Sequence, residues 1–206
     1  MKDKIKEHFD HIKNVLNKND SLLLKQVRKI AVILEKKILS KKKVLVYGNG
    51  GSFADCSHFV GELTATYNSK NRRSLPFILL GSNLAAVTAW ANDFEFNDYI
   101  EREFSAIATD KDILFLLSTS GGNIKKKQSI NLIKLAKYAK KNNITIISLL
   151  GKGGGELKKI SDYSIIIKSF NTGTVQEMHK IILHSICNYL ENIKKWSFQK
   201  HLLEYH

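Results

Sequence analysis

Five short runs of almost continuous apolar residues follow residue 43. Because nearly every position in each run is apolar, we expect parallel strands that are buried on both faces of a sheet. The expected strands are Val44–Tyr47, Phe77–Leu80, Ile113–Leu117, Thr145–Leu149 and Tyr163–Ile167.

Helical segments separate these runs. They are expected at Phe53–Tyr67, Asn83–Ala91, Asp98–Ala108, Lys125–Lys141 and Glu156–Ile160, and a long helix at about Val175–Lys195 follows the last strand. Alternation of strand and helix predicts an α/β fold, a doubly wound sheet of five parallel strands.

The first 40 residues predict two leading helices. Apolar residues recur there at helical spacing, and Asn19-Asp20-Ser21 is a plausible break and cap between the helices. Because no linker or repeat interrupts the chain, we expect one domain over residues 1–206, with residues 1–40 as its helical extension.

Charge and composition narrow the classes of function. No long apolar stretch follows the positive charges at the amino terminus, so we expect neither a signal peptide nor a membrane partner. Two cysteines, Cys56 and Cys187, are too few for a disulfide scaffold, which favours a reducing cytoplasm.

The net charge of +14 comes largely from short lysine clusters, such as Lys41–Lys43 and Lys125–Lys127. Aromatic residues do not interleave with them as a nucleic-acid platform requires, so nucleic acid is not an expected partner. We interpret them as solvated charge, or alternatively as a field that gathers phosphorylated substrates. Asn71-Arg72-Arg73 is likewise interpreted as solvated, or as a border of the substrate entrance.

A glycine-rich loop, Gly48-Asn49-Gly50-Gly51-Ser52, lies between the first strand and the next helix. Glycines allow a sharp turn and a close approach of the backbone to a ligand, and a helix amino terminus favours an anion. The same composition also suits an ordinary tight turn.

A second loop, Ser118-Thr119-Ser120-Gly121-Gly122-Asn123, follows the third strand. Its hydroxyls and backbone amides can surround a phosphate without a fixed cation. Ligands of such sheets bind beyond the carboxyl ends of the strands, where both loops are expected. A phosphate site is therefore predicted at the second loop.

Residues of the metal-ligating types occur on two predicted helices. His58 and Glu62 are four residues apart and share a helix face, which suits a shared zinc ion but also an ordinary surface pair. Gln176 and His184 are eight residues apart on the last helix, about 12 Å along its axis. They could meet one ion only at full reach, or from different subunits.

Four segments together resemble the bacterial phosphoheptose isomerases of the sugar isomerase (SIS) superfamily. These segments are GNGGSFADCSHFVGEL, AWAND, STSGG and VQEMHKIILH, and the resemblance covers nearly the whole chain. It implies a flavodoxin-like SIS fold and a homotetramer with active sites at subunit contacts, with residues 1–40 in oligomer packing. The implied reaction interconverts sedoheptulose 7-phosphate and D-glycero-D-manno-heptose 7-phosphate through a cis-enediol, supplying heptose for lipopolysaccharide or capsule.

The resemblance also implies the site residues. The zinc (Zn2+) ligands are His58, Glu62, Gln176 and His184, and Glu62 and His184 form the acid–base pair. The implied substrate contacts, besides Gln176, are Asn49, Gly50, Gly51, Ser52, Asn92, Asp93, Ser118, Thr119 and Ser120. Such a reaction needs a base near the carbon acid and an acid for the oxygen, and zinc can polarise the carbonyl.

Three departures from the family pattern bear on the substrate. Gly122 and Asn123 follow Gly121 where the family continues with asparagine and serine, so one phosphate-binding hydroxyl is counted as missing. Gly173-Thr174-Val175 replaces a stretch that usually carries an arginine, often after an aspartate. Trp90 occupies a position that is usually small or aliphatic.

Three other functions stay open at this point. A paralogue of these isomerases is a non-catalytic tetramer that binds the bacterial replication initiator, but it lacks the helix glutamate and final histidine that Glu62 and His184 match. A sugar-phosphate sensor on this fold often carries a DNA-binding domain, for which forty leading residues are too few. An isomerase or epimerase of another sugar phosphate is the third alternative.

Overall fold

The computed structural model describes residues 3–17, 20–191 and 193 of the chain. Its centre is a five-stranded sheet, in which all neighbouring strands are parallel and the order is β2-β1-β3-β4-β5. The strands are β1 (Val44–Gly48), β2 (Phe77–Leu79), β3 (Ile113–Ser118), β4 (Thr145–Leu150) and β5 (Tyr163–Ile166). This is the strand order of flavodoxin-like folds, and it confirms the expected doubly wound sheet.

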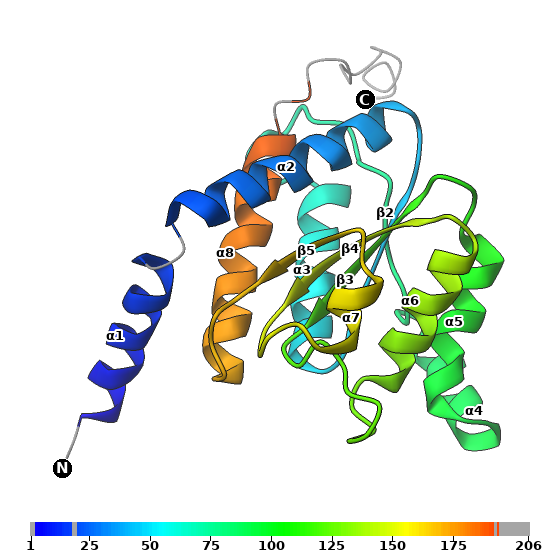
Figure 1. The fold of residues 1–206 in the computed structure, drawn as a ribbon. Helices are drawn as coiled ribbons and strands as arrows, with labels where there is room; N and C mark the ends of the chain where they lie inside the picture. The colour runs from blue at the N-terminus through cyan, green and yellow to red at the C-terminus, as the bar shows by residue number, and fades with distance from the viewer. Residues whose placement is uncertain (1–2, 18–19, 192, 194–206) are drawn as a thin grey trace.

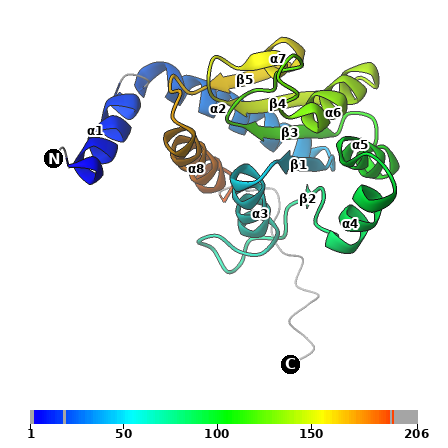
Figure 2. The same ribbon diagram turned by 90° about the horizontal axis from the view of Figure 1, so that it is seen from below.

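Both faces of the sheet are covered, which explains the unbroken apolar runs. Alternate residues of one strand enter two different cores: Val44 and Val46 contact one, while Leu45 and Tyr47 contact the other. Residues of α2 (Asp20–Leu39), α3 (Gly51–Thr64) and α8 (Thr172–Leu190) complete the first core. Residues of α5 (Phe96–Ile107), α6 (Ile130–Lys141) and α7 (Gly155–Ile160) complete the second. Figure 2 shows the sheet between these helices.

The first two helices precede β1, and the later helices alternate with the strands. The helices are α1 (Lys4–Asn17), α2 (Asp20–Leu39), α3 (Gly51–Thr64), α4 (Leu84–Asp93), α5 (Phe96–Ile107), α6 (Ile130–Lys141), α7 (Gly155–Ile160) and α8 (Thr172–Leu190). Helix α1 extends away from the sheet (Figure 1). It contacts α8 near the α8 amino terminus. There His8 Nε2 lies 2.8 Å from a carboxylate oxygen of Glu177.

Several expected helix boundaries differ from the structure, most clearly the start of α6. Helix α6 begins at Ile130, and not at Lys125, because Asn123 and Gln128 exchange backbone hydrogen bonds of 3.0 and 2.9 Å and close a short hairpin. The lysines Lys125–Lys127 lie in this hairpin. Helix α8 ends at Leu190, before the expected Lys195, which itself lies outside the described residues, as does Asn19 of the expected break.

No helix in the part of the chain that the structure describes is long and apolar enough to cross a membrane.

Candidate active site

The two sequence-predicted loops follow adjacent strands. The glycine-rich loop follows β1 and the serine-rich loop follows β3, and β1 and β3 pair from Val44↔Ile113 to Gly48↔Leu117. The chain reverses its winding direction between these two strands, which is where ligands bind in sheets of this kind. The structure therefore brings both loops to one edge of the sheet.

The glycine-rich loop is tightly packed. A Cβ added at Gly48 would lie 3.0 Å from the carbonyl oxygen of Leu117, and Gly50 has a positive φ of 55°. Ser52 is buried in the first turn of α3, whereas Gly50 and Gly51 are exposed. The exposed backbone of this loop is thus available to a ligand at the amino terminus of α3.

Asn49 is held by a small buried network. Its Oδ1 accepts hydrogen bonds from the Tyr47 hydroxyl at 3.0 Å and from Asn131 Nδ2 at 2.8 Å, and its Nδ2 donates to Asn131 Oδ1 at 3.0 Å. Asn131 is 1% exposed. Burial raises the pKa of Tyr47 to about 12, which keeps its hydroxyl protonated as a donor. Sequence reasoning missed Tyr47 and Asn131, because their role depends on contacts between β1 and α6.

The serine-rich loop folds back on its own hydroxyls. Ser118 Oγ accepts the backbone N–H of Gly121 at 3.0 Å, and Ser120 Oγ accepts that of Gly122 at 3.2 Å. The two hydroxyl oxygens are 3.4 Å apart. Ser118 is buried, and Thr119 and Ser120 are half-buried. The arrangement gathers small polar groups at one point, as a phosphate requires.

Ser129 adds a hydroxyl to this group. Its Oγ lies 3.5 Å from Ser120 Oγ, and Ser129 is the residue directly before α6. The Asn123–Gln128 hairpin loops out between the two serines and returns the chain to the same place. A hydroxyl was expected to be missing because the positions directly after Gly121 carry none, and Ser129 lies further along the chain. Only the hairpin pairing identifies Ser129.

Three of the four predicted metal ligands lie together where α3 packs against α8. His58 Nε2 is 2.8 Å from Glu62 Oε1, and the rings of His58 and His184 meet edge to face with centroids 5.2 Å apart. His58 and Glu62 keep 43% and 25% of their side-chain surface exposed. The cluster is therefore open to solvent.

Gln176 is placed elsewhere on the same pair of helices. Its Nε2 would lie 2.4 Å from a Cβ added at Gly51, so its amide lies against the start of α3. Between Gln176 and His184, Lys180 Nζ pairs with Asp55 Oδ1 at 3.3 Å. The helices thus run in the same direction, and Gln176 lies about two turns from the other three donors.

Imidazole nitrogens and a carboxylate oxygen are ligands that zinc accepts, so the donor set fits such an ion chemically. In the conformation described here, however, His58 and Glu62 bind each other. Among residues 3–17, 20–191 and 193, no three His, Cys, Asp or Glu side chains are arranged to hold a metal ion. Binding would require the exposed His58 and Glu62 side chains to turn toward a common point.

Asn92 and Asp93 lie at the end of α4, both exposed, and Asn92 Nδ2 donates to Asp93 Oδ1 at 2.8 Å. Their contact with a substrate remains a prediction. The expectation that the Asn71-Arg72-Arg73 segment is solvated is wrong for Arg72, which is 8% exposed and pairs with Glu191, whereas its two neighbours are exposed. That the segment borders the substrate entrance stays a prediction. Glu191 is too distant from Arg72 in the chain for a sequence pattern to identify the pair.

Comparisons with known proteins agree with this geometry. Residues 7–151 match the SIS domain family. A phosphoheptose isomerase 1 from Campylobacter jejuni is 35% identical over 90% of this chain and 95% of its own length. A phosphoheptose isomerase from Campylobacter concisus is 41% identical over 71% of this chain and 74% of its own.

Among solved structures, a phosphoheptose isomerase from Francisella tularensis superposes with a TM-score of 0.84 at 27% identity, covering 91% of this chain and 96% of that one. Family, sequence and structure comparisons lead to one assignment: this chain belongs to the phosphoheptose isomerases, an enzyme family with the SIS fold.

Proposed function

We propose that this protein interconverts sedoheptulose 7-phosphate and D-glycero-D-manno-heptose 7-phosphate. The observation that carries the proposal is the gathering of His58 and Glu62, on the helix that leads away from the glycine-rich loop, with His184 of α8. Its relatives named phosphoheptose isomerase support the substrate class.

The proposed reaction moves a proton between two adjacent carbons through a cis-enediol. Glu62 acts as the base that takes the proton from one carbon and returns it to the other. His184, on the facing helix, transfers a proton at the substrate oxygen or at carbon. The contact between the His58 and His184 rings supports this division, because it brings groups from α3 and α8 to one place.

Substrate binding is assigned to the two loops. The hydroxyls of Ser118, Thr119 and Ser120, together with that of Ser129, bind the phosphate. Asn49, Gly50, Gly51 and Ser52 face the sugar chain, and the Tyr47–Asn131 network keeps Asn49 in one orientation. Asn92 and Asp93 are assigned to the sugar hydroxyls.

We assign His58, Glu62, Gln176 and His184 to a zinc site. A zinc ion there would polarise the carbonyl oxygen of the substrate. His58 and Glu62 contact each other at 2.8 Å, so each side chain would have to exchange this contact for the ion. Gln176 either turns away from Gly51 or joins the site of a neighbouring subunit.

A homotetramer with active sites at subunit contacts is part of the proposal. Large apolar residues are exposed on α1 and around α4: Ile5 is 73% exposed, Phe9 59%, Leu84 71% and Phe94 61%. Such residues suit burial against other subunits. Light scattering after size exclusion checks this, and a monomer at micromolar concentration would contradict it. We further place the enzyme in the cytoplasm, supplying heptose for lipopolysaccharide or capsule.

The experiment for the proposed function is an assay on sedoheptulose 7-phosphate with metal-stripped protein, repeated after zinc is added back. We expect turnover only with zinc. Stoichiometric zinc binding without turnover points to another sugar phosphate, and absence of both zinc binding and turnover contradicts the proposal.

A further inference from the structure

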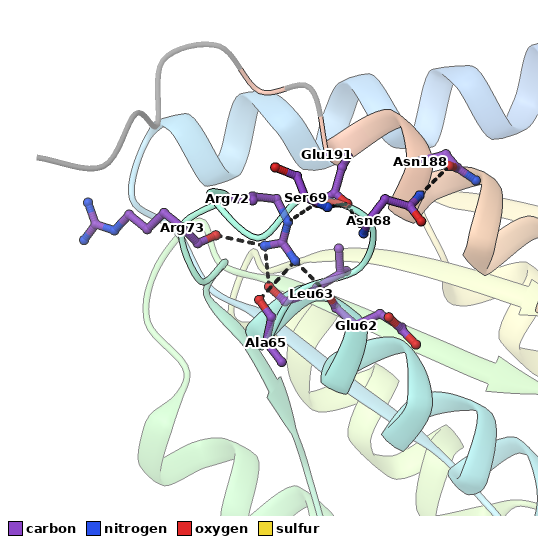
Figure 3. Close-up of polar contacts among 9 residues, drawn as sticks. All are labelled: Glu62, Leu63, Ala65, Asn68, Ser69, Arg72, Arg73, Asn188 and Glu191. Carbon is purple, nitrogen blue, oxygen red and sulfur yellow. Dashed lines mark hydrogen bonds and ion pairs between the residues drawn. The ribbon is translucent and has the colours of Figure 1, made fainter. Parts of the chain in front are cut away.

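The segment between α3 and β2 meets the end of α8 at a buried ion pair (Figure 3). Arg72 Nε donates to Glu191 Oε1 at 2.6 Å, and the two side chains are only 5% and 9% exposed. Moving both charges out of water costs free energy that their mutual attraction offsets only in part. The ion pair by itself is therefore weak evidence that this contact stabilises the fold. Its partners indicate another role.

On one side, Arg72 binds the end of α3. Its Nη2 donates to the carbonyl oxygen of Glu62 at 2.6 Å, and its Nη1 donates to that of Leu63 at 2.8 Å. Carbonyls in the last turn of a helix lack partners within the helix, and a cation is favourable there. Arg72 therefore fixes the backbone of Glu62, whose carboxylate belongs to the cluster with His58 and His184.

On the other side, the contacts lead to the end of α8. Glu191 Oε2 accepts the backbone N–H of Asn68 at 2.7 Å, and Asn68 Nδ2 donates to Asn188 Oδ1 at 3.2 Å. Asn188 Nδ2 in turn donates to the carbonyl oxygen of His184 at 3.0 Å. A continuous series of hydrogen bonds thus joins the backbone of Glu62 on α3 to that of His184 on α8.

We propose that this series, which we call the Arg72 bridge (Arg72, Glu191, Asn68 and Asn188), sets the spacing between Glu62 and His184. Arg72 and Glu191 are then positioning residues for metal binding and proton transfer. This inference rests on the proposed function. Contacts that orient the groups of a metal or catalytic site control its affinity and rate, because small displacements are costly there.

Two conservative variants test the bridge. Glu191→Gln keeps the shape of the side chain but removes its charge, and Arg72→Lys keeps the charge but removes the planar fork that reaches several acceptors. In each we expect the zinc dissociation constant to rise about tenfold or more and kcat to fall. KM for sedoheptulose 7-phosphate should change by less than about threefold, because the loops are untouched.

Asp112→Asn is the matched control. Asp112 is also buried, pairs with Lys43 Nζ at 2.8 Å and accepts backbone N–H groups, but it precedes β3 at the opposite edge of the sheet. We expect it to lower Tm like the bridge variants while leaving zinc affinity and kcat unchanged. Should a single bridge variant fail to fold, Arg72→Met/Glu191→Met removes both charges together.

Hydrogen exchange of the metal-free proteins separates this inference from the proposed function. We expect faster exchange near Glu62 and His184 in the bridge variants but not in Asp112→Asn. If the unmodified protein neither binds zinc nor isomerises the sugar while these exchange changes appear, the bridge stands and the proposed function fails. Folded bridge variants with unchanged exchange, zinc affinity and kcat would overturn the inference.

Discussion

The two edges of the sheet both carry polar side chains, but these side chains have different partners. At the amino-terminal edge, Asp112 accepts the backbone N–H of Lys43 at 2.9 Å, and Asp162 accepts that of Ile146 at 2.9 Å. Each aspartate also pairs with a lysine, Lys43 or Lys140. The polar groups of this edge are thus used to join one element to the next.

At the carboxyl-terminal edge, short hydroxyl and amide side chains replace the charged pairs. Ser120 and Ser129 contact each other at 3.5 Å, and the exposed Gly50 and Gly51 leave the backbone accessible. Hydrogen bonds between loop hydroxyls can be exchanged for bonds to a ligand, whereas removing the partners of the buried Asp112 carboxylate would leave its charge uncompensated. The amino-terminal edge therefore serves stability, whereas the carboxyl-terminal edge suits the proposed binding of a ligand.

The largest effect is expected at the cluster beside the binding edge. Glu62→Gln removes the proposed base while keeping an oxygen that can bind His58, so kcat should fall about a thousandfold or more. The free energy of unfolding should change by less than about 1 kcal/mol, since the pair is partly exposed. Steady-state kinetics measure kcat, and urea unfolding measures the free energy of unfolding. As a control, Glu35→Gln on α2 should keep full activity. Full activity in Glu62→Gln would contradict the assignment of Glu62 as the base.

The serine-rich loop should be the most sensitive part of the binding edge to added volume. Gly121 has a φ of 68°, and an added Cβ would lie 2.1 Å from the carbonyl oxygen of Gly154. Gly121→Ala should therefore cost about 3 kcal/mol of stability and raise KM. Gly153 has a φ of 82° with open space around it, so Gly153→Ala should cost only about 1 kcal/mol. Equal costs in urea unfolding would show that the loop packing is not tight.

Alkaline pH should weaken the binding edge through Tyr47. Burial raises its pKa from 10.0 to about 12 in the folded state, so the unfolded chain releases this proton first. The contribution of Tyr47 to the free energy of unfolding is fully present below pH 10. It should fall by about 3 kcal/mol as pH rises toward 12. Urea unfolding of Tyr47→Phe should show a smaller alkaline loss than the unmodified protein. An identical loss would mean that Tyr47 is not buried as described.

Acid should weaken the opposite edge through Asp112. Burial alone would raise the pKa of this carboxyl, but hydrogen bonds from Lys43 and Thr109 outweigh burial and lower it below 3.8. Its stabilising effect is present above pH 3.8 and is lost as pH falls below that value. The stability difference between the unmodified protein and Asp112→Asn should therefore narrow in acid. A difference that stays constant down to pH 2 would contradict this account.

The smallest effect is expected at Ser129. Its φ of 53° suits glycine, so Ser129→Gly removes the hydroxyl without straining the backbone. Loss of one hydrogen bond to the phosphate should raise KM about tenfold with little change in kcat or stability. The control is Ser40→Gly, because Ser40 lies just after α2 and far from the loops. Ser105→Gly is less suitable, because Ser105 lies within α5. An unchanged KM in Ser129→Gly would remove Ser129 from the phosphate site.

Local pattern was sufficient for the sheet but not for every contact at the site. The strands were predictable because residues such as Leu114 and Phe115 are buried on opposite faces, which makes the whole run apolar. The places of the glycine-rich and serine-rich loops were predictable because these loops directly follow β1 and β3. The start of α6 was not, since the backbone pairing of Asn123 with Gln128 outweighs the helix-forming lysines between them.

Long-range partners account for the remaining differences. Arginine is usually found at the protein surface. The burial of Arg72 depends on Glu191, which lies 119 residues further along the chain. The contact between His58 and His184 likewise requires α3 and α8 to pack side by side. The position of Gln176 on Gly51 could not be inferred from its spacing to His184 alone.

The most direct test of the central claim is proton NMR of sedoheptulose 7-phosphate in D2O with zinc-loaded protein. If Glu62 moves a proton between adjacent carbons through an enediol, the proton signals of the aldose, heptose 7-phosphate, should appear. Because the proton held by Glu62 can exchange with D2O before it is returned, deuterium at C2 should weaken the C2 proton signal, and Glu62→Gln should produce no aldose signals. A ketose spectrum that stays unchanged with the zinc-loaded protein, or equal exchange in Glu62→Gln, would contradict the account.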